Sequence, residues 1–226
     1  MKIVIVGGGK VAAHLVSLLT AEFEHKITII EMRRETSMYL ADSLDIRVIN
    51  GDGSDIHVLE VAAVDQADLL VSLTGEDETN LVVCQLGKIH FNVATTVARV
   101  NNPKNMDTFR RLGVDKIVCG TKLLADIIDQ EINYAGMRLA FDIPQSNMGI
   151  LEFYLDPQSD AVGKTLLEYT FPGQAKVVLV TRPDGKVELP TGDLRMQRGD
   201  RMLMVADKKH YEKIWDRLVD QEATFT

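Results

Sequence analysis

Three consecutive glycines, Gly7, Gly8 and Gly9, stand near the start of the chain in the stretch VIVGGGKVAAHL, between a short apolar run and a segment with helical spacing. Glycine lets a backbone turn tightly, and it also lets a backbone come close to a ligand. The order Gly7-x-Gly9-x-x-Ala12 matches G-x-G-x-x-G/A, the pattern of loops that hold the phosphates of a dinucleotide. A tight turn that binds nothing is the alternative interpretation.

Each small residue of this motif has a physical assignment. Gly7 would allow the tight turn, Gly9 would let the backbone approach a pyrophosphate, and Ala12 would let the following helix pack closely on the sheet. The N-terminus of that helix would offer free N–H groups and the positive end of the helix dipole to a phosphate.

A carboxylate stands where such a site needs one. Glu31 ends the second apolar run, about 20 residues after the glycines, where its oxygens would accept hydrogen bonds from ribose hydroxyls. Like-charge repulsion would disfavour a 2′-phosphate there, whereas Arg33 and Arg34 could pair with a phosphate or stack on adenine. We therefore expect a ligand with a free 2′-OH, either NAD(H) or an adenine nucleotide. A solvated carboxylate at a strand end is the alternative.

Strands and helices alternate along the part of the chain that must position these residues. Strands are expected at 3–6, 27–30, 46–49, 67–73, 94–100 and 116–118, with helices after the glycines and at 35–44, 56–62, 81–89, 104–112 and 122–134. This alternation predicts an α/β fold with a Rossmann-like, doubly wound parallel sheet covered on both faces. The carboxyl ends of its strands share one edge, where such folds bind ligands.

Three further strands are expected to end at this edge in residues suited to a ligand. The third leads into NGDGSD, the fourth into LTGEDETN, and an arginine ends the fifth. An arginine can reach phosphates as a charged donor, and the other residues could border the adenine or line the cleft. The residues concerned are Asp52, Gly53, Thr74, Gly75, Asn80 and Arg99.

After about residue 141 the pattern changes to strands separated by turn residues. The stretches GILEFYLDP, KVVLVTRPDGKVELPTGD and DRMLMVAD are typical of strands, with RPDG as a turn, and helices are expected at 160–169 and 209–219. This predicts a second, smaller α+β domain at 136–226 after a nucleotide-binding lobe at 1–135. The boundary is expected near 136–145, where IPQSN marks it.

Composition and charge exclude several classes of protein. The chain has 226 residues and a formal net charge of −8, so a general nucleic-acid binder is not expected. Cys84 and Cys119 stand in apolar surroundings and are expected to be buried free thiols. Met1-Lys2 leads directly into a strand, and no apolar stretch approaches the roughly 20 residues of a membrane span. We therefore expect a cytoplasmic protein.

The motifs GGGKVA, TIIE, NGDGSD, LTGEDETNLVV, ARVNNP and LGVDKIV, in this order and spacing, resemble the RCK domain. RCK domains are the cytosolic regulators of potassium conductance, including the Trk/Ktr-type potassium-uptake subunits. The stretches AVGKTLLEY, VVLVTRPDGKVELPTGD and RGDRMLMVAD resemble the C-terminal RCK subdomain. The resemblance covers essentially the whole chain and is to the single-RCK form.

This resemblance implies a regulatory subunit that gates a membrane potassium transporter and is not an enzyme. It would assemble as homodimers in a ring and touch the inner face of the plasma membrane only through the transporter. NAD(H), ATP or ADP would bind in the N-terminal cleft, and exchange of the ligand would change the shape of the ring. The residues assigned to that cleft are Gly7, Gly8, Gly9, Lys10, Val11, Glu31, Met32, Arg33, Asp52, Gly53, Ser54, Thr74, Gly75, Glu76, Asn80 and Arg99.

Two further implications concern additional ligands. Some relatives bind a second small ligand, such as a cyclic dinucleotide, in the C-terminal subdomain, and Val178–Thr181 and Pro190 lie in the matching region. Some relatives also carry a Pro-Glu pair after the sixth strand that helps to hold a cation. Gly120 and Thr121 take its place here, so no metal site is predicted. Ala12 replaces a glycine of many relatives, and packing should tolerate this change.

An NAD-dependent oxidoreductase is the main alternative function, because the same cleft serves both classes of protein. Such an enzyme needs an acid or base facing the hydride, yet the sequence has no Tyr-x-x-x-Lys and no pair of histidines at metal-binding spacing. His57 alone is expected near the adenine loop, and a place on a helix surface is favoured for it. A nucleotide-binding interaction module without a transporter is a third interpretation.

Overall fold

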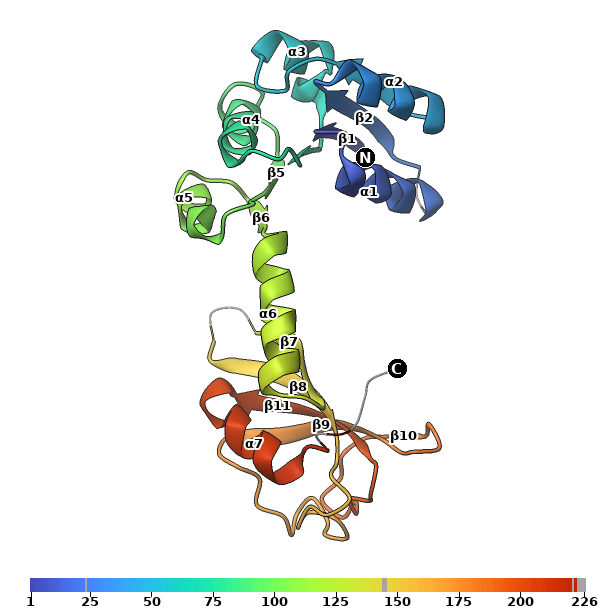
Figure 1. Ribbon diagram of the computed structural model, residues 1–226, viewed down its shortest axis with the longest axis vertical. Coiled ribbons are helices and arrows are strands. Elements are labelled where there is room, and N and C mark those ends of the chain that lie inside the picture. Colours follow the sequence, from blue (N-terminus) through green and yellow to red (C-terminus); the bar gives the residue numbers. More distant parts are fainter. Residues whose placement is uncertain (23, 144–145, 221, 223–226) are drawn as a thin grey trace. The chain divides into compact units, whose positions relative to one another are not determined.

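The computed structural model describes residues 1–22, 24–143, 146–220 and 222. The chain divides into two compact units, Met1–Leu124 and Ala125–Thr226, and both are drawn in Figure 1. The division falls within helix α6 (Gly120–Asn133). The functional boundary expected between residues 135 and 136 stays a prediction.

The first unit is built on a parallel sheet with the strand order β3-β2-β1-β4-β5-β6. The order reverses between β1 and β4, which is the switch point of a doubly wound sheet, so the predicted Rossmann-like fold is confirmed. The strands are β1 (Lys2–Val6), β2 (Lys26–Glu31), β3 (Arg47–Asn50), β4 (Leu69–Ser72), β5 (Thr95–Arg99) and β6 (Lys116–Val118).

Helices cover both faces of this sheet. Ile3 and Ile5 of β1 pack in one core cluster with residues of α1 and α2, whereas Val4 and Val6 pack in another with residues of α3 and α4. Burial on both faces explains why β1 is apolar at successive positions. The helices are α1 (Lys10–Glu22), α2 (Arg34–Ser43), α3 (Ile56–Val61), α4 (Asp77–Ile89) and α5 (Met106–Arg111), with short 3₁₀ helices η1 (Val64–Gln66) and η2 (Pro103–Asn105).

The second unit contains an antiparallel sheet with the strand order β10-β9-β11-β8-β7. Helix α7 places Ile214 and Leu218 in the same core cluster as Phe153 and Met202 of the strands. A second α+β domain is therefore confirmed. Its elements after α6 are β7 (Met137–Asp142), β8 (Met148–Tyr154), β9 (Ala175–Thr181), β10 (Val187–Glu188), β11 (Arg201–Asp207), η3 (Lys208–His210) and α7 (Tyr211–Leu218).

The helix predicted for Asp160–Tyr169 is wrong, because this segment forms a series of turns. Gly163 has a φ of 82°, which does not fit a right-handed helix. The N–H of Gly163 donates to the Met196 carbonyl (2.9 Å), and the N–H of Leu166 donates to the Leu194 carbonyl (3.0 Å). Pairing with a distant segment thus takes the hydrogen bonds that a helix would have made within itself.

The segment 136–145, near which the domain boundary is expected, contains strand β7. This strand pairs antiparallel with β8, from Met137 opposite Phe153 to Asp142 opposite Gly149. Residues 144 and 145 of the IPQSN stretch lie outside the described residues. Because turn residues follow β7 directly, the sequence of this strand resembles part of a linker.

Three predicted helices differ from the structure in their start or their helix type, and the ends of α2, α3 and α6 differ from the prediction by one or two residues. Helix α4 begins at Asp77, whereas the sequence predicts a start at Leu81. The predicted helix at 104–112 is η2 followed by α5, and the Asn102 side chain caps η2 by accepting a hydrogen bond from the Lys104 N–H (3.1 Å). The predicted helix at 209–219 is η3 followed by α7.

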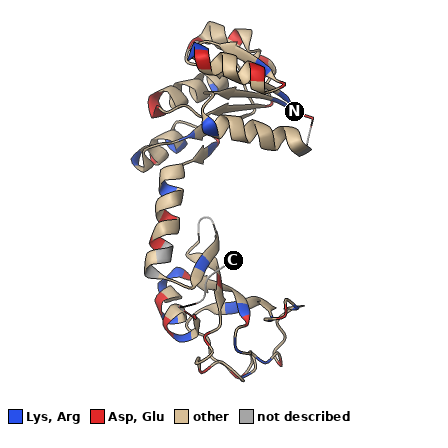
Figure 2. Ribbon diagram, turned by 45° about the vertical axis from the view of Figure 1, so that its right-hand side comes forward, with Lys and Arg blue, Asp and Glu red and all other residues tan. Residues whose placement is uncertain are grey.

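Charged residues of both signs are interspersed along the elements of both units, as Figure 2 shows. In the second unit, for example, the Arg182 guanidinium pairs with Asp200 (2.7 Å) and Glu188 (2.8 Å). None of the helices in the described parts of the chain is long and apolar enough to cross a bilayer.

Both cysteines are buried and free, as predicted. Burial raises the pKa of the Cys84 thiol to about 12, and the nearby negative charge of Asp115 adds to this effect. Because the thiolate is the reactive form, we expect Cys84 to resist a thiol reagent at pH 8 in the folded protein and to react once denaturant is added. Rapid labelling of Cys84 in the native state, mapped by mass spectrometry, would contradict this prediction.

Candidate functional site

A cleft of about 440 Å³ lies at the carboxyl edge of the parallel sheet, next to the switch point between β1 and β4. This volume is typical of sites for small ligands, and doubly wound sheets bind their ligands at this place. The cleft is lined by Val6, Gly7, Gly8, Gly9, Ile30, Glu31, Met32, Arg33, Gly51, Asp52, Gly53, Leu73, Thr74, Gly75, Glu76, Thr79 and Arg99.

The structure brings most of the predicted residues together in this cleft and places a few elsewhere. The predicted residues that do not line it are Lys10, Val11, Ser54 and Asn80. The lining residues that the sequence analysis missed are Val6, Ile30, Gly51, Leu73 and Thr79. Each missed residue is the chain neighbour of a predicted one. Four of them lie at or next to a strand end, and Thr79 lies in the first turn of α4.

The three glycines have three different environments. Gly7 has a φ of 97°, and a Cβ there would lie 3.1 Å from the backbone of Leu73 and Thr74 at the end of β4. At Gly8 a Cβ would lie 2.4 Å from Leu40 Cδ1. Gly9 has no atom within 4 Å of a Cβ position. Gly7 therefore needs glycine for the fold, a side chain at position 8 would have to displace the buried Leu40, and Gly9 leaves open space at the start of α1.

Glu31 is the buried anchor of the site, with only 4% of its surface exposed. Its Oε2 accepts a hydrogen bond from the Gly8 N–H (2.6 Å), and its Oε1 accepts from the Arg33 N–H (2.9 Å) and Nε (2.9 Å). A carboxylate offers about four acceptor positions. Because three internal donors occupy three of these positions, one position is left for a ligand hydroxyl. A second becomes available if the Arg33 side chain moves away.

These hydrogen bonds keep Glu31 ionised. Burial by itself raises the pKa of the Glu31 carboxyl, but the hydrogen bonds from Arg33 and Gly8 and the charge of Arg33 outweigh it and lower the pKa below the usual 4.5. A negatively charged acceptor is therefore present in the cleft at neutral pH, where it favours neutral hydroxyls over a phosphate group.

The loop after β3 closes one side of the cleft. Asp52 Oδ1 accepts hydrogen bonds from the N–H (2.9 Å) and the hydroxyl (2.8 Å) of Ser54, which fixes the turn. A Cβ at Gly53 would lie 2.2 Å from Val6 Cγ1, so this loop packs directly on the end of β1. Ser54 thus shapes the loop without lining the cleft.

Asn80 is fully buried and organises the end of β4. Its Oδ1 accepts hydrogen bonds from the Ser72 hydroxyl (2.8 Å) and from the N–H (2.9 Å) and hydroxyl (2.7 Å) of Thr74. Its Nδ2 donates to the carbonyls of Thr74 (3.2 Å) and Arg99 (2.9 Å). Asn80 therefore holds two lining residues in place and does not itself face the cleft.

The cleft can hold an anionic ligand that carries hydroxyl groups. Arg33 and Arg99 are its cationic side chains, and the start of α1 follows the glycines at its floor. N–H groups and the dipole at a helix N-terminus attract phosphate, while the Glu31 carboxylate accepts hydroxyls. In the described parts of the chain, no group of three or more His, Cys, Asp or Glu is placed to hold a metal ion.

A second hollow of about 380 Å³ lies in the C-terminal unit and includes Pro190 and Val177 among its lining residues. Pro190 was predicted for a second ligand together with Val178–Thr181, which belong to strand β9. The hollow is lined mainly by apolar side chains, such as Leu166 and Phe171. A second ligand there stays a prediction.

The fold and the cleft define the class of this protein as a doubly wound domain with the features of a nucleotide site, joined to a small α+β domain. Family comparisons agree: the TrkA-N domain matches residues 3–120, and the TrkA-C domain matches residues 150–218. The chain therefore belongs to the TrkA family, and its resemblance to RCK proteins is confirmed.

Two curated relatives show how far the likeness extends. A Trk system potassium uptake protein TrkA homolog of Methanothermobacter thermautotrophicus is 29% identical over 202 residues, which cover 89% of this chain and 92% of the relative. A Trk system potassium uptake protein trkA homolog 1 of Methanosarcina mazei is 30% identical over 224 residues, which cover 95% of this chain but only 54% of the relative.

Solved structures support the fold at lower sequence identity. A structure titled GsuK Channel has a TM-score of 0.68 and 18% identity, and the match covers 97% of this chain and 39% of that chain. A structure titled GsuK channel bound to NAD has a TM-score of 0.54 and 20% identity, with coverage of 95% and 38%. At identities of 18% and 20%, the likeness to these structures establishes the fold alone.

Proposed function

We propose that this chain is a cytoplasmic, nucleotide-binding regulatory subunit of a membrane potassium-uptake system. The observation that carries the proposal is the cleft at the β1/β4 switch point, where a glycine loop, a helix N-terminus and the Glu31 carboxylate meet. This cleft belongs to a chain in which both TrkA domains are present. Relatives over nearly its whole length are named for potassium uptake.

The ligand of the cleft is an adenine nucleotide with a free 2′-OH, either NAD(H) or ATP/ADP. Glu31 accepts the ribose hydroxyls, the loop of Asp52 and Gly53 borders the adenine, and Gly9, Thr74 and Arg99 face the phosphates. Structures of similar fold carry NAD, ADP or AMP in their titles, which supports this class of ligand.

The partner is a membrane-embedded potassium transporter, which the chain contacts from the cytoplasmic side as homodimers assembled into a ring. Apolar side chains on α6 are exposed in the single chain, which supports burial against another copy. They belong to Leu123, Leu124, Ile127, Ile128 and Ile132. A ligand that favours one state of such a ring by about 1–3 kcal/mol per coupled site changes gating about 5–150-fold.

The oxidoreductase alternative is not favoured. The residues that line the cleft include no His, Lys, Cys or Tyr in the described parts of the chain. Glu31, a carboxylate able to act as a base, is committed to three internal donors. His57 has 81% of its side chain exposed and pairs with Glu60 on the surface of α3. We propose binding without a chemical step.

The test of this function is potassium transport. The chain is expressed with the potassium-transporter subunit of its own genome in cells that lack other potassium uptake, and the initial rate of Rb⁺ uptake is measured. We expect the chain to change the rate by at least about fivefold and Gly9→Asp to remove the nucleotide-dependent part. Equal rates with and without the chain would overturn the proposal.

A further inference from the structure

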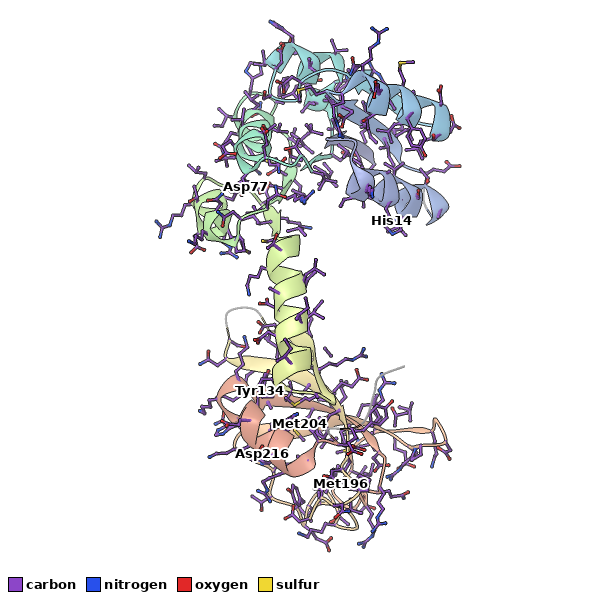
Figure 3. All side chains as sticks on the ribbon, in the orientation of Figure 1. His14, Asp77, Tyr134, Met196, Met204 and Asp216 are labelled. Atoms are coloured by element: carbon purple, nitrogen blue, oxygen red, sulfur yellow. The ribbon has the colours of Figure 1, made fainter. Side chains whose placement is uncertain are left out.

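Asp77, the first residue of α4, is a buried carboxylate that no ligand explains. Only 7% of its surface is exposed. Its Oδ1 accepts hydrogen bonds from the N–H (2.6 Å) and the side-chain Nδ2 (3.0 Å) of Asn101. Its Oδ2 accepts from the Asn102 N–H (3.1 Å) and Asn105 Nδ2 (2.7 Å). Figure 3 shows Asp77 between the start of α4 and the segment that leads to α5.

These four donors come from a single segment that does not line the cleft. Asn101 and Asn102 connect β5 to η2, and Asn105 is the last residue of η2, directly before α5. Burial raises the pKa of the Asp77 carboxyl, but the hydrogen bonds from the three asparagines outweigh it and lower the pKa. Asp77 is thus held as a charged acceptor, and charge-assisted hydrogen bonds of this kind are the strong ones.

Asn101, which binds Asp77, also contacts the backbone that lines the cleft. Asn101 Nδ2 donates to the carbonyl of Gly75 (3.1 Å) and lies 3.5 Å from the carbonyl of Thr74. Thr74, Gly75 and Glu76 form the strip that lines the cleft directly before Asp77. A movement of this strip therefore changes the hydrogen bonds of Asn101 and, through Asp77, those of Asn102 and Asn105.

We propose that Asp77 is a positioning residue that couples occupation of the nucleotide cleft to the segment 101–112, which comprises η2 and α5. The proposal rests on the proposed function, because it requires a ligand whose phosphate shifts residues 74–76 when the ligand binds or leaves. The coupling element is the hydrogen-bond network that joins Asp77 to Asn101, Asn102 and Asn105. None of these four residues lines the cleft. This network connects the cleft of the first unit to helix α5.

The test is amide hydrogen exchange of the full chain with and without saturating ADP or NADH, read peptide by peptide. In the wild type we expect the ligand to slow exchange at 7–12, at 74–80 and, by about fivefold or more, at 101–112. In Asp77→Asn, protection at 7–12 should persist while the effect at 101–112 disappears. The matched control is Asp107→Asn, the same charge change on an exposed side chain of α5, which should behave like the wild type.

Each result decides between the two proposals. Ligand protection at 101–112 that survives in Asp77→Asn overturns the coupling role and leaves the proposed function intact, as does a wild type protected only around the glycines. Loss of protection at 7–12 in a folded Asp77→Asn also overturns it, because Asp77 would then act on binding itself. A wild type with no protection anywhere overturns the proposed function. If Asp77→Asn does not fold, Asn105→Ala, which removes one donor, should reduce the effect at 101–112.

Discussion

A Gly9→Asp variant is expected to lose nucleotide binding while keeping its fold. Gly9 precedes the first residue of α1, where aspartate is a favourable helix cap, and no atom lies within 4 Å of a Cβ at this position. The fold therefore tolerates the side chain. A carboxylate at this place faces the phosphates, and a like-charge contact costs several kcal/mol, so we expect affinity to fall about 100-fold or more. Titration calorimetry with ADP, ATP, NAD and NADH measures it.

The control for this variant is Gly9→Asn, which has nearly the same shape, caps a helix equally well and carries no charge. We expect it to bind somewhat more weakly than the wild type because of its bulk, but to keep most of the roughly 100-fold in affinity that Gly9→Asp loses, because that loss comes from the charge. Equal affinity of Gly9→Asp and the wild type would show that phosphates do not approach this loop.

A Glu31→Gln variant is expected to lose both stability and ribose recognition. The wild-type carboxylate accepts three internal hydrogen bonds, and an amide nitrogen cannot accept any of them. At least one buried N–H is then left unpaired, which costs about 1–3 kcal/mol of unfolding free energy. The exposed Glu35→Gln in the first turn of α2 should change stability by less than about 0.5 kcal/mol. Urea unfolding of both variants measures the difference.

The pH dependence of this variant has a defined sign. Because the folded-state pKa of Glu31 is lower than the usual 4.5, its ionisation stabilises the wild type fully above that value and progressively less as the pH falls through the folded pKa. The stability gap between wild type and Glu31→Gln should therefore be largest near neutral pH and shrink in acid. A gap that is constant from pH 7 to pH 3 would contradict the assignment.

Glu31→Gln should also change the choice of ligand. We expect affinity for NADH to fall about tenfold through the weakened hydroxyl contacts, and affinity for NADPH to fall less, because the repulsion of the 2′-phosphate is removed. The ratio of the two dissociation constants, measured by fluorescence titration, reports this effect. An unchanged ratio would mean that Glu31 does not face the ribose.

The carboxyl edge of the sheet was predictable from the sequence because one rule controls it. Parallel strands bring their carboxyl ends to the same side, so residues far apart in the chain, such as Gly9, Glu31, Asp52 and Thr74, meet whatever the helices do. The residues missed there, such as Val6, lie one position away from predicted ones, since the spacing of a motif locates a strand end but not the atoms that face the cleft.

The expectation that Asn80 lines the cleft depended on the predicted start of α4. With a start at Leu81, Asn80 belongs to the loop and looks like a ligand residue. With the observed start at Asp77, the residues Asp77, Asn80, Cys84 and Gly87 share the buried face of the helix. A polar side chain on that face must find internal partners, and for Asn80 these are Ser72, Thr74 and the Arg99 carbonyl.

The second unit was harder to predict because long-range pairing overrides local preference there. The segment 160–169 has a composition compatible with a helix, yet its backbone bonds to Leu194 and Met196. Strand β7 has six residues and pairs with β8. The contacts of 160–169 join segments that are distant in the chain, so no short window of sequence contains them. Strand β7 pairs with the next strand along the chain, and turn residues that follow it directly hide it.

The most direct test of the account is photolabelling of the purified chain with 8-azido-ADP, followed by mapping of the labelled peptide. We expect a label in residues 31–34 or 52–56, beside the adenine, that excess ADP or NADH prevents and that Gly9→Asp lacks. A third hollow, of about 430 Å³, lies at the amino edge of the same sheet and is lined by residues that include Lys26 and Arg47. A label confined to that hollow, or to the one around Phe171 and Pro190, would contradict binding in the cleft.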